Sequence, residues 1–497
     1  MLRAVTRRRT TAAVIGAGLL WVPDASAHSV AGSYDYPLPE WLWLVAACGA
    51  VALTFAVALL RVPPPPPADE PPGGPRHPGL GRVVRVALPI AEALSVALMV
   101  LTIVSCLAGS DDPNRSFGTI YFWVVWWVCL GIVATLAGDI YAWISPWAVV
   151  VRRVLAPLAG DPGAYGRMPY PAGLGRWPAA AALLGFAWLE LVYEPAHEPQ
   201  TLGLILLAYS VVALVLPLVI GIDAWQRCVD PFGVLSATLS RASATELRAL
   251  PDEPCEACTV AERDPAPLRI DCACCYRRAE PQHREIRGRV PGFGVLRGGT
   301  LGPGGAAFVI VALGSIVFDG ISQTQRWFSL MGDISEQFPS LNPSSSRVLA
   351  TLGLLGVTAL LGLLLLVCAR WLPGGPARFA AALIPIAGVY FIAHYAAYML
   401  VLGQLAIPLL SDPLDRGWNL FGTAGYHTED FLRPAMVWYG QVVLIIFGHA
   451  AAVLAAHRLG RERGEARSVR AELPAAALAV AYTLVGLWVL AQQIKPD

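Results

Sequence analysis

Ten apolar runs constrain the fold of this chain more than any other feature of its sequence. They lie near 40–62, 86–108, 117–138, 178–195, 201–222, 304–321, 346–370, 378–402, 434–457 and 472–493. Each is long enough, or nearly so, to cross about 30 Å of hydrocarbon as a helix. Only 14% of the residues are charged, whereas soluble proteins carry about 25%. The sequence therefore predicts an all-α, polytopic integral membrane protein with about ten transmembrane helices in a lipid bilayer.

The first 27 residues have the three parts of a secretory signal peptide. Arginines at positions 3 and 7–9 precede a short apolar core, and Ala25-Ser26-Ala27 forms an A-x-A cleavage site. Cleavage there would leave His28 as the mature N-terminus. An uncleaved membrane anchor is the alternative interpretation.

Basic residues are distributed unevenly between the loops, and this predicts the orientation of the helices. The segments 61–86, 151–177, 223–304, 370–378 and 458–470 carry 26 Lys and Arg residues, and the loops on the other side carry six. Because basic loops stay on the cytoplasmic side, both termini are predicted to lie outside, as a cleaved signal peptide and an even number of helices require. We expect a multi-pass protein of a bacterial plasma membrane. The formal net charge of +1 argues against a nucleic-acid partner.

The predicted domains follow from these boundaries. They are a signal peptide (1–27), membrane helices 1–5 (28–222), a cytoplasmic Cys-rich segment (223–303) and membrane helices 6–10 (304–497). The Cys-rich segment is too small to enclose much of a hydrophobic core, so a metal or the membrane face must help it fold.

Four polar residues within the apolar runs are predicted to share one depth in the outer half of the membrane. A helical rise of about 1.5 Å per residue brings Asp319, His394, Glu190 and Gln441 to similar levels. Buried polar groups in hydrocarbon are costly and often functional, and carboxylates with imidazole are suited to a metal or proton site. Hydrogen bonds that only join helices are the alternative.

Three other histidines are further candidates for metal ligands. His449 and His457 follow each other on the ninth run, deeper than His394 and near the inner surface, respectively. His28, as a mature N-terminus, would offer an amine and an imidazole to one metal, a chelate that favours copper. The predicted metal residues are His28, Asp319, His394, Gln441, His449 and His457, with copper or zinc as the divalent metal.

Five cysteines cluster in the segment 223–303. They are Cys255, Cys258, Cys272, Cys274 and Cys275. A Cys-x2-Cys pair followed by more cysteines in a reducing compartment favours a structural zinc site over a disulfide. Redox sensing and incidental thiols are the alternatives.

Four stretches resemble a known family. They are AHSVAGSYDYPLPEWLW at the start of the mature chain, FDGISQTQRW, IAHYAAYML and GHAAAVLAAH. In these stretches the chain resembles the bacterial polytopic membrane proteins known as fenitrothion hydrolases. The resemblance implies organophosphate hydrolysis at the membrane and a related membrane subunit as partner. It carries over no catalytic residues, and the cysteine cluster looks like an insertion.

Two functions of different classes are therefore expected. The first is a metal-dependent hydrolase of apolar organophosphate-type esters, with Asp319, His394 and Glu190 as catalytic residues and a metal-activated water. The alternative is a metal-ion or proton transporter or channel that uses a path from His394 through His449 to His457. A non-catalytic subunit of a membrane complex is a third interpretation.

Overall fold

The computed structural model describes most of the chain between residues 78 and 461. The described residues are Gly49, 78–158, 168–253, Cys255, Cys258, Val260, 269–297, 301–338, 343–370, 375–429, 431–461, 477, 480–482 and 484–486. The predicted signal peptide, His28 and nearly all of the first apolar run lie outside them.

The described chain is mostly helical, and seven of its helical segments are long and apolar enough to cross a membrane. They are α3 (Pro78–Ala108), Phe117–Ala137, α10 (Pro199–Ile220), α15 (Pro303–Ser322), α17 (Pro343–Ala369), Gly375–Ser411 and α21 (Pro434–Arg461). The helix α9 (Trp177–Leu191) is apolar but has 15 residues, which span only about 22 Å. The prediction of a helical, polytopic chain is confirmed at this level.

Several of these segments are composed of shorter helices. Phe117–Ala137 comprises α4 (Phe117–Ile120), the π-helix η2 (Tyr121–Trp126) and α5 (Trp127–Ala137), and Gly375–Ser411 comprises α18 (Gly375–Ala382), α19 (Ile384–Leu402), η10 (Gly403–Leu405) and α20 (Ala406–Ser411). The connecting elements are α6 (Tyr141–Ile144), α7 (Pro146–Val150), η3 (Val151–Leu155), α8 (Ala156–Leu158), η4 (Ala172–Leu174), η5 (Glu194–His197), α11 (Ile222–Ala224), η6 (Trp225–Val229), α12 (Pro231–Leu239), η7 (Ser240–Ala242) and α16 (Gln325–Gln337).

Glycine ends two of the membrane helices. Gly138 follows α5 with a φ of 113°, and Gly221 follows α10 with a φ of 88°. Residues with a Cβ rarely adopt such angles, so glycine is the favoured residue at both helix ends.

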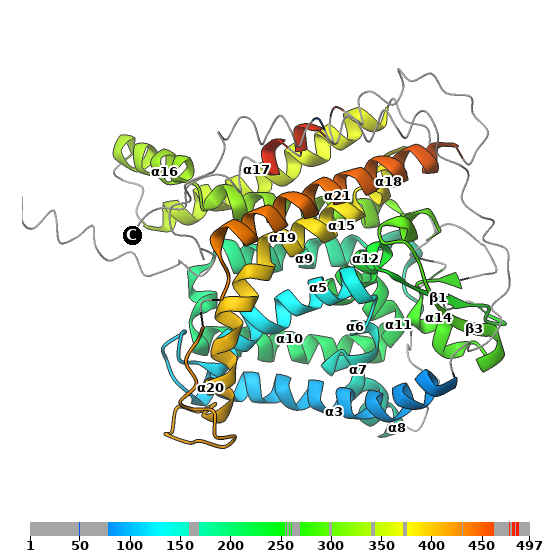
Figure 1. The fold of residues 1–497 in the computed structure, drawn as a ribbon, viewed down its shortest axis with the longest axis horizontal. Coiled ribbons are helices and arrows are strands. Elements are labelled where there is room, and N and C mark those ends of the chain that lie inside the picture. The colour runs from blue at the N-terminus through cyan, green and yellow to red at the C-terminus, as the bar shows by residue number, and fades with distance from the viewer. Residues whose placement is uncertain are drawn as a thin grey trace, which may run out of the picture.

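The helix α19 lies in the middle of the bundle, packed against α5, α15 and α21 (Figure 1). Its apolar side chains meet a cluster of aromatic rings: Phe391 contacts Trp127 edge to face at 5.4 Å between centroids, and Trp127 contacts Phe186 at 4.5 Å. Such pairs add about 0.5–1.5 kcal/mol beyond the area that they bury. This cluster packs α19 against α5 and α9.

The segment 223–303 divides into two parts in the structure. All nine residues of α12 are buried, and α12 packs against α5, α9 and α19. The described residues from 245 to 297, here called the strand module, form a three-stranded antiparallel sheet beside the bundle (Figure 1). The sheet was not expected from the sequence, so the chain is mainly helical rather than entirely so.

The strands of the module are β1 (Thr245–Ala249), β2 (Arg269–Ile270) and β3 (Arg284–Gly288), in the order β2-β1-β3. The register pairs Leu247 with Ile286 and Arg248 with Ile270. The module also contains α14 (Ala273–Arg278), η8 (Pro281–His283) and η9 (Phe293–Leu296). Two hydrogen bonds attach the start of the module to the end of α5. The N–H of Ala244, the residue before β1, donates to the Leu136 carbonyl at 3.2 Å, and the Thr245 hydroxyl donates to the Ala137 carbonyl at 2.5 Å.

Candidate functional site

Asp319 of α15 and His394 of α19 are in direct contact inside the bundle. The distance from His394 Nε2 to Asp319 Oδ2 is 2.9 Å. The Asp319 side chain is fully buried, and the His394 side chain is 11% exposed. Two of the residues that the sequence placed at one depth are therefore partners.

Tyr395 completes this contact from the same helix as His394. Its hydroxyl donates to Asp319 Oδ2 at 2.8 Å. One carboxylate oxygen thus lies between an imidazole and a phenol, both of which can exchange a proton with it. A carboxylate in this position orients the imidazole ring.

Glu190 of α9 is the third residue of this site. It is buried in α9, which packs against α15. Its carboxyl group lies close enough to Asp319, Tyr395 and Tyr398 to interact with each electrostatically. The backbone carbonyl oxygen of Glu190 is 2.9 Å from Nε2 of His197. The structure therefore brings together the three residues predicted to be catalytic.

Gln441 has a different partner. Its Nε2 donates to the carbonyl oxygen of Ala393 at 2.8 Å. This bond joins α21 to α19 one residue before His394. The contact matches the helix-joining interpretation of this residue.

His449 lies away from the Asp319–His394 pair. Its Nδ1 is 2.8 Å from the Ile445 carbonyl, and its Nε2 has no hydrogen-bond partner among the described residues. Its ring is 5.9 Å from that of Tyr482, which is 6.1 Å from Tyr390, which is 6.3 Å from His394, between centroids. The histidines do not converge, but two tyrosines lie between them.

Tyr390 and Tyr482 were not identified from the sequence. Both side chains are in the bundle, and both hydroxyls lack a partner within the described part of the chain. Tyr390 precedes His394 by four residues, a spacing that puts both on one helix face, and this signal could have identified it. Nothing in the sequence indicates that Tyr482, near the C-terminus, reaches the same place.

The remaining predicted metal ligands do not extend this site. His28 lies outside the described residues, and of His457 only the helical backbone is described. Within the described ranges, the one group of three or more Cys, His, Asp or Glu side chains whose ligand atoms converge consists of cysteines.

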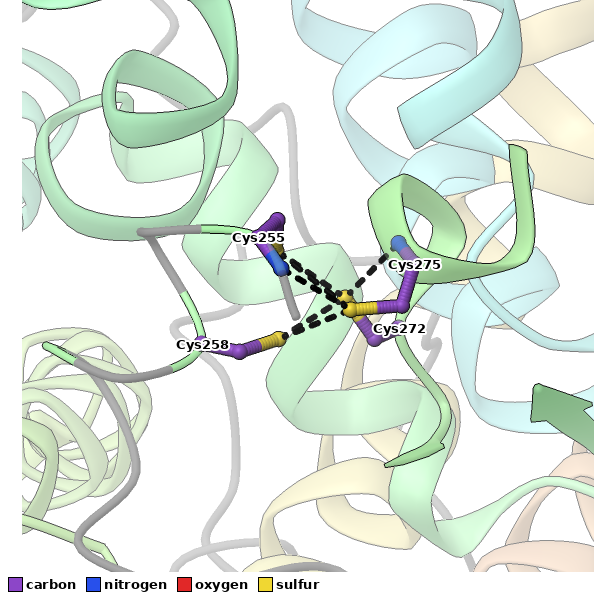
Figure 2. A group of neighbouring side chains, drawn as sticks. All are labelled: Cys255, Cys258, Cys272 and Cys275. Carbon is purple, nitrogen blue, oxygen red and sulfur yellow. Dashed lines mark hydrogen bonds between the residues drawn. The ribbon is translucent and has the colours of Figure 1, made fainter. Parts of the chain in front are cut away.

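That group is Cys255, Cys258, Cys272 and Cys275 (Figure 2). All four side chains are buried, and their ligand atoms lie within 4.8 Å of one another. The Sγ–Sγ distances include 3.7 Å for Cys255–Cys272, 3.7 Å for Cys258–Cys275, 3.5 Å for Cys255–Cys275 and 2.9 Å for Cys258–Cys272. The cluster can bind a metal such as zinc. The fifth predicted cysteine, Cys274, is not one of the four.

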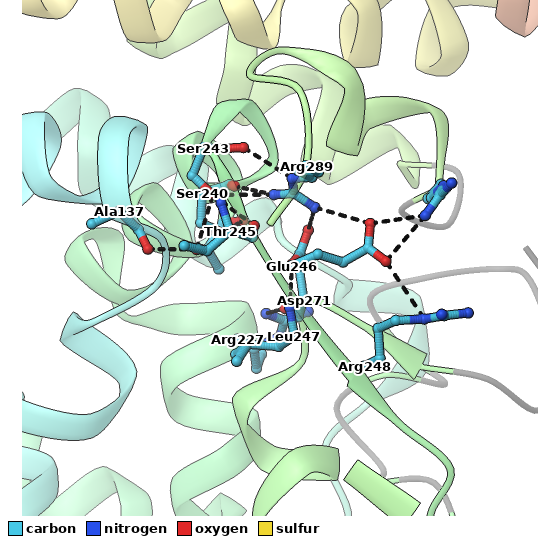
Figure 3. Close-up of polar contacts among 12 residues, drawn as sticks. Ala137, Arg227, Ser240, Ser243, Thr245, Glu246, Leu247, Arg248, Asp271 and Arg289 are labelled. Carbon is cyan, nitrogen blue, oxygen red and sulfur yellow. Dashed lines mark hydrogen bonds and ion pairs between the residues drawn. The ribbon is translucent and has the colours of Figure 1, made fainter. Parts of the chain in front are cut away.

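Buried ion pairs surround the sheet of the strand module (Figure 3). Arg289 Nη1 is 2.5 Å from Asp271 Oδ2, and Arg297 Nη1 is 3.2 Å from Glu246 Oε1. Burial raises the pKa of Asp271, and the adjacent Arg289 guanidinium lowers it in part. Sequence analysis did not identify this network, because charged residues on short strands are usually exposed.

Comparisons of the chain with protein-family models, with curated proteins and with solved structures found no match.

Proposed function

We propose that the protein transfers protons within a bacterial plasma membrane, as a proton or proton-coupled ion transporter, through a relay centred on Asp319 and His394. The observation that carries the proposal is the 2.9 Å contact between their side chains inside the helix bundle. Histidine changes its charge near neutral pH, and ionisable residues within membrane segments commonly form proton relays. Asp319 holds one imidazole nitrogen, so the other can accept a proton and release it.

Three further groups support a path that leads from this pair on α19 to His449 on α21. Tyr390, Tyr482 and His449 follow one another with ring centroids about 6 Å apart. The Tyr390 and Tyr482 hydroxyls and His449 Nε2 are buried, and none has a hydrogen-bond partner in the described residues. Burying such a group alone costs about 1–3 kcal/mol. Each can donate or accept a proton, so together they are suited to a relay that water completes.

A small cavity lies next to Tyr482. Its volume is about 30 Å³, and its other lining residues are Ile310, Leu313, Leu361, Leu365, Leu383 and Ile386. A water molecule needs roughly 10–15 Å³ of such volume, so the cavity is large enough for water.

Proton flux into liposomes that contain the purified protein tests the proposal. A pH-sensitive dye inside the vesicles reports acidification under an imposed pH gradient and membrane potential. His394→Ala and Asp319→Asn should each reduce flux by about 100-fold, the usual contribution of a positioned proton-transfer group. His427→Ala is the matched control, because His427 is exposed in a loop, and it should conduct like the wild type. Unchanged flux in His394→Ala would exclude the relay.

A second candidate function is hydrolysis of apolar organophosphate-type esters. A carboxylate bonded to a partly exposed imidazole is also a general-base pair that can activate water, and the resemblance to fenitrothion hydrolases supports this chemistry. In this candidate, His394 takes the proton of the attacking water, Asp319 orients the ring, and Glu190 adjusts the charge of the pair. Release of p-nitrophenol from a phosphotriester, lost in His394→Ala, would favour it over transport.

A related membrane subunit is the proposed partner in either case. If neither flux nor hydrolysis is measured with the purified chain, co-expression with the related subunit tests the non-catalytic interpretation. Activity that appears only in the pair, and persists with His394→Ala in this chain, would assign the chemistry to the partner.

Zinc is the proposed metal of the four-cysteine cluster, because four buried thiols at tetrahedral spacing suit this ion. Its role is structural, since four sulfur ligands leave no open position for substrate. The copper chelate at His28 stays a prediction.

A further inference from the structure

The strand module has an unusual core. The buried residues that pack together in it are Ala249, Ala279 and the five cysteines, with Tyr276 partly buried beside them. Large aliphatic side chains are missing from this cluster of described residues. A segment of this size with so little apolar volume needs a metal or a disulfide to hold it together, and the structure has all five cysteines as free thiols.

The geometry of the cluster fits a tetrahedral ion. Zinc with sulfur ligands at about 2.3 Å places the sulfurs nearly 4 Å apart, and three of the four pairs given above are 3.5–3.7 Å apart. Cys255 and Cys258 approach from one side, and Cys272 and Cys275 approach from the start of α14, as its N-cap and a residue of its first turn (Figure 2). The ligands therefore form two Cys-x2-Cys pairs, the second of which is contained in the sequence Cys-x-Cys-Cys.

Backbone N–H groups point at the same sulfurs. Cys275 N–H points to Cys272 Sγ at 3.4 Å, where Cys272 is the N-cap of α14, and Cys255 N–H points to Cys275 Sγ at 3.5 Å. Such bonds stabilise thiolates and orient metal ligands. Cys274 instead lines a small pocket together with Asp139, Asp223 and Arg277.

The residue before Cys272 connects the cluster to the helix bundle. Asp271 has a φ of 54°, a left-handed conformation that costs a non-glycine residue about 1–3 kcal/mol. Its carboxylate accepts from Arg289 and from the Leu247 N–H, and its carbonyl accepts from Arg227 of η6 at 3.3 Å. On the other side of the ligands, Arg277 donates to the Ala142 carbonyl at 3.3 Å.

We propose that zinc held by Cys255, Cys258, Cys272 and Cys275 is the folding core of the strand module and fastens the module to the bundle through Asp271 and Arg277. The proposal rests on zinc as the metal of the cluster. The metal fixes the start of α14, which carries Cys272 and Cys275. The residue before it, Asp271, presents its carbonyl to Arg227, and α14 itself presents the Arg277 guanidinium to Ala142. Without the metal, Arg289 and Leu247 still contact Asp271, but the chain that follows Asp271 is no longer fixed, so both bonds to the bundle weaken.

The test uses the full chain in detergent, with zinc measured by elemental analysis and order measured by hydrogen exchange. Purified protein should contain a single zinc per chain. A zinc chelator should increase exchange at least tenfold in 245–249 and 284–288, while exchange in α19 stays unchanged, and added zinc should restore protection. Cys272→Ser should lose the metal, and the matched variant Cys274→Ser should keep both metal and protection.

The outcomes distinguish a failure of zinc as the metal from a failure of its role in folding and fastening the module. Protein without zinc, or with iron in its place, overturns zinc as the metal. Zinc that is present but can be removed without faster exchange in β1 and β3 leaves zinc as the metal and overturns the fastening role. Equal loss of metal in Cys274→Ser and Cys272→Ser overturns the ligand set. The chelation experiment needs no mutant, so it stands even where Cys272→Ser does not fold.

Discussion

The helix bundle and the strand module are stabilised by different kinds of core. In the bundle, rings such as Trp127, Phe186 and Phe391 pack edge to face. In the module, thiols and charges make up much of what is buried, with Glu246 and Arg248 almost fully buried on β1. Dispersion and apolar burial are spread over many atoms, whereas a buried charge depends on a few partners. The bundle should therefore respond to changes in volume, and the module to the loss of a single partner.

The largest expected effect is in the module. Arg289 donates to Asp271 and to the carbonyls of Ser240 and Ser243. Arg289→Ala leaves the buried carboxylate of Asp271 without its cation, which typically costs about 3–5 kcal/mol of folding free energy. Hydrogen exchange in β1 and β3 should rise accordingly. Arg278→Ala is the control: its side chain is 53% exposed in its ion pair with Asp223, so the expected cost is below about 1 kcal/mol.

An intermediate effect is expected where α21 crosses α19. A Cβ added at Gly448 would lie 2.0 Å from Cγ2 of Val389, so Gly448→Ala should cost about 1–3 kcal/mol through overpacking. The melting temperature of the variant in detergent measures this loss of stability. Gly440→Ala on the same helix meets nothing within 4 Å, and it should be neutral or slightly stabilising. Equal melting temperatures of the two variants would contradict close packing at this crossing.

The smallest effect depends on pH and concerns Asp230, the N-cap of α12. Burial raises its pKa to about 6, although the Tyr209 hydroxyl opposes this by donating to the carboxylate. The folded state therefore binds a proton more strongly than the unfolded state, whose pKa is near 3.8. This stabilisation is complete below the unfolded pKa and is lost as pH rises through about 6. The loss between pH 5 and pH 7 should be about 1 kcal/mol, and Asp230→Asn should remove this part of the pH dependence of the melting temperature.

The two regions also differ in how well the sequence predicted them. Helices in the bundle follow from long apolar runs, and the common depth of Asp319, His394 and Glu190 follows from the constant rise of a helix. In β1, alternation suggests that Leu247 faces the core, but Leu247 is only half-buried while Glu246 and Arg248 are buried. Ion pairs bury the charged side chains of β1 in place of its apolar one. The partners of Glu246, which are Arg289 and Arg297, lie 40 or more residues away in the sequence.

The sequence by itself determined the elements whose cause is local. These are the apolar helices, the glycine that ends α5, and the Cys255-x2-Cys258 pair. Only the tertiary structure decided which groups meet: Tyr395 with Asp319, Tyr482 between Tyr390 and His449, and Cys275 rather than Cys274 with the other three thiols. The physical reason is that helix periodicity sets the face and depth of a residue on its own helix. Rotation and packing of neighbouring elements set its partner, and these depend on contacts between residues far apart in the chain.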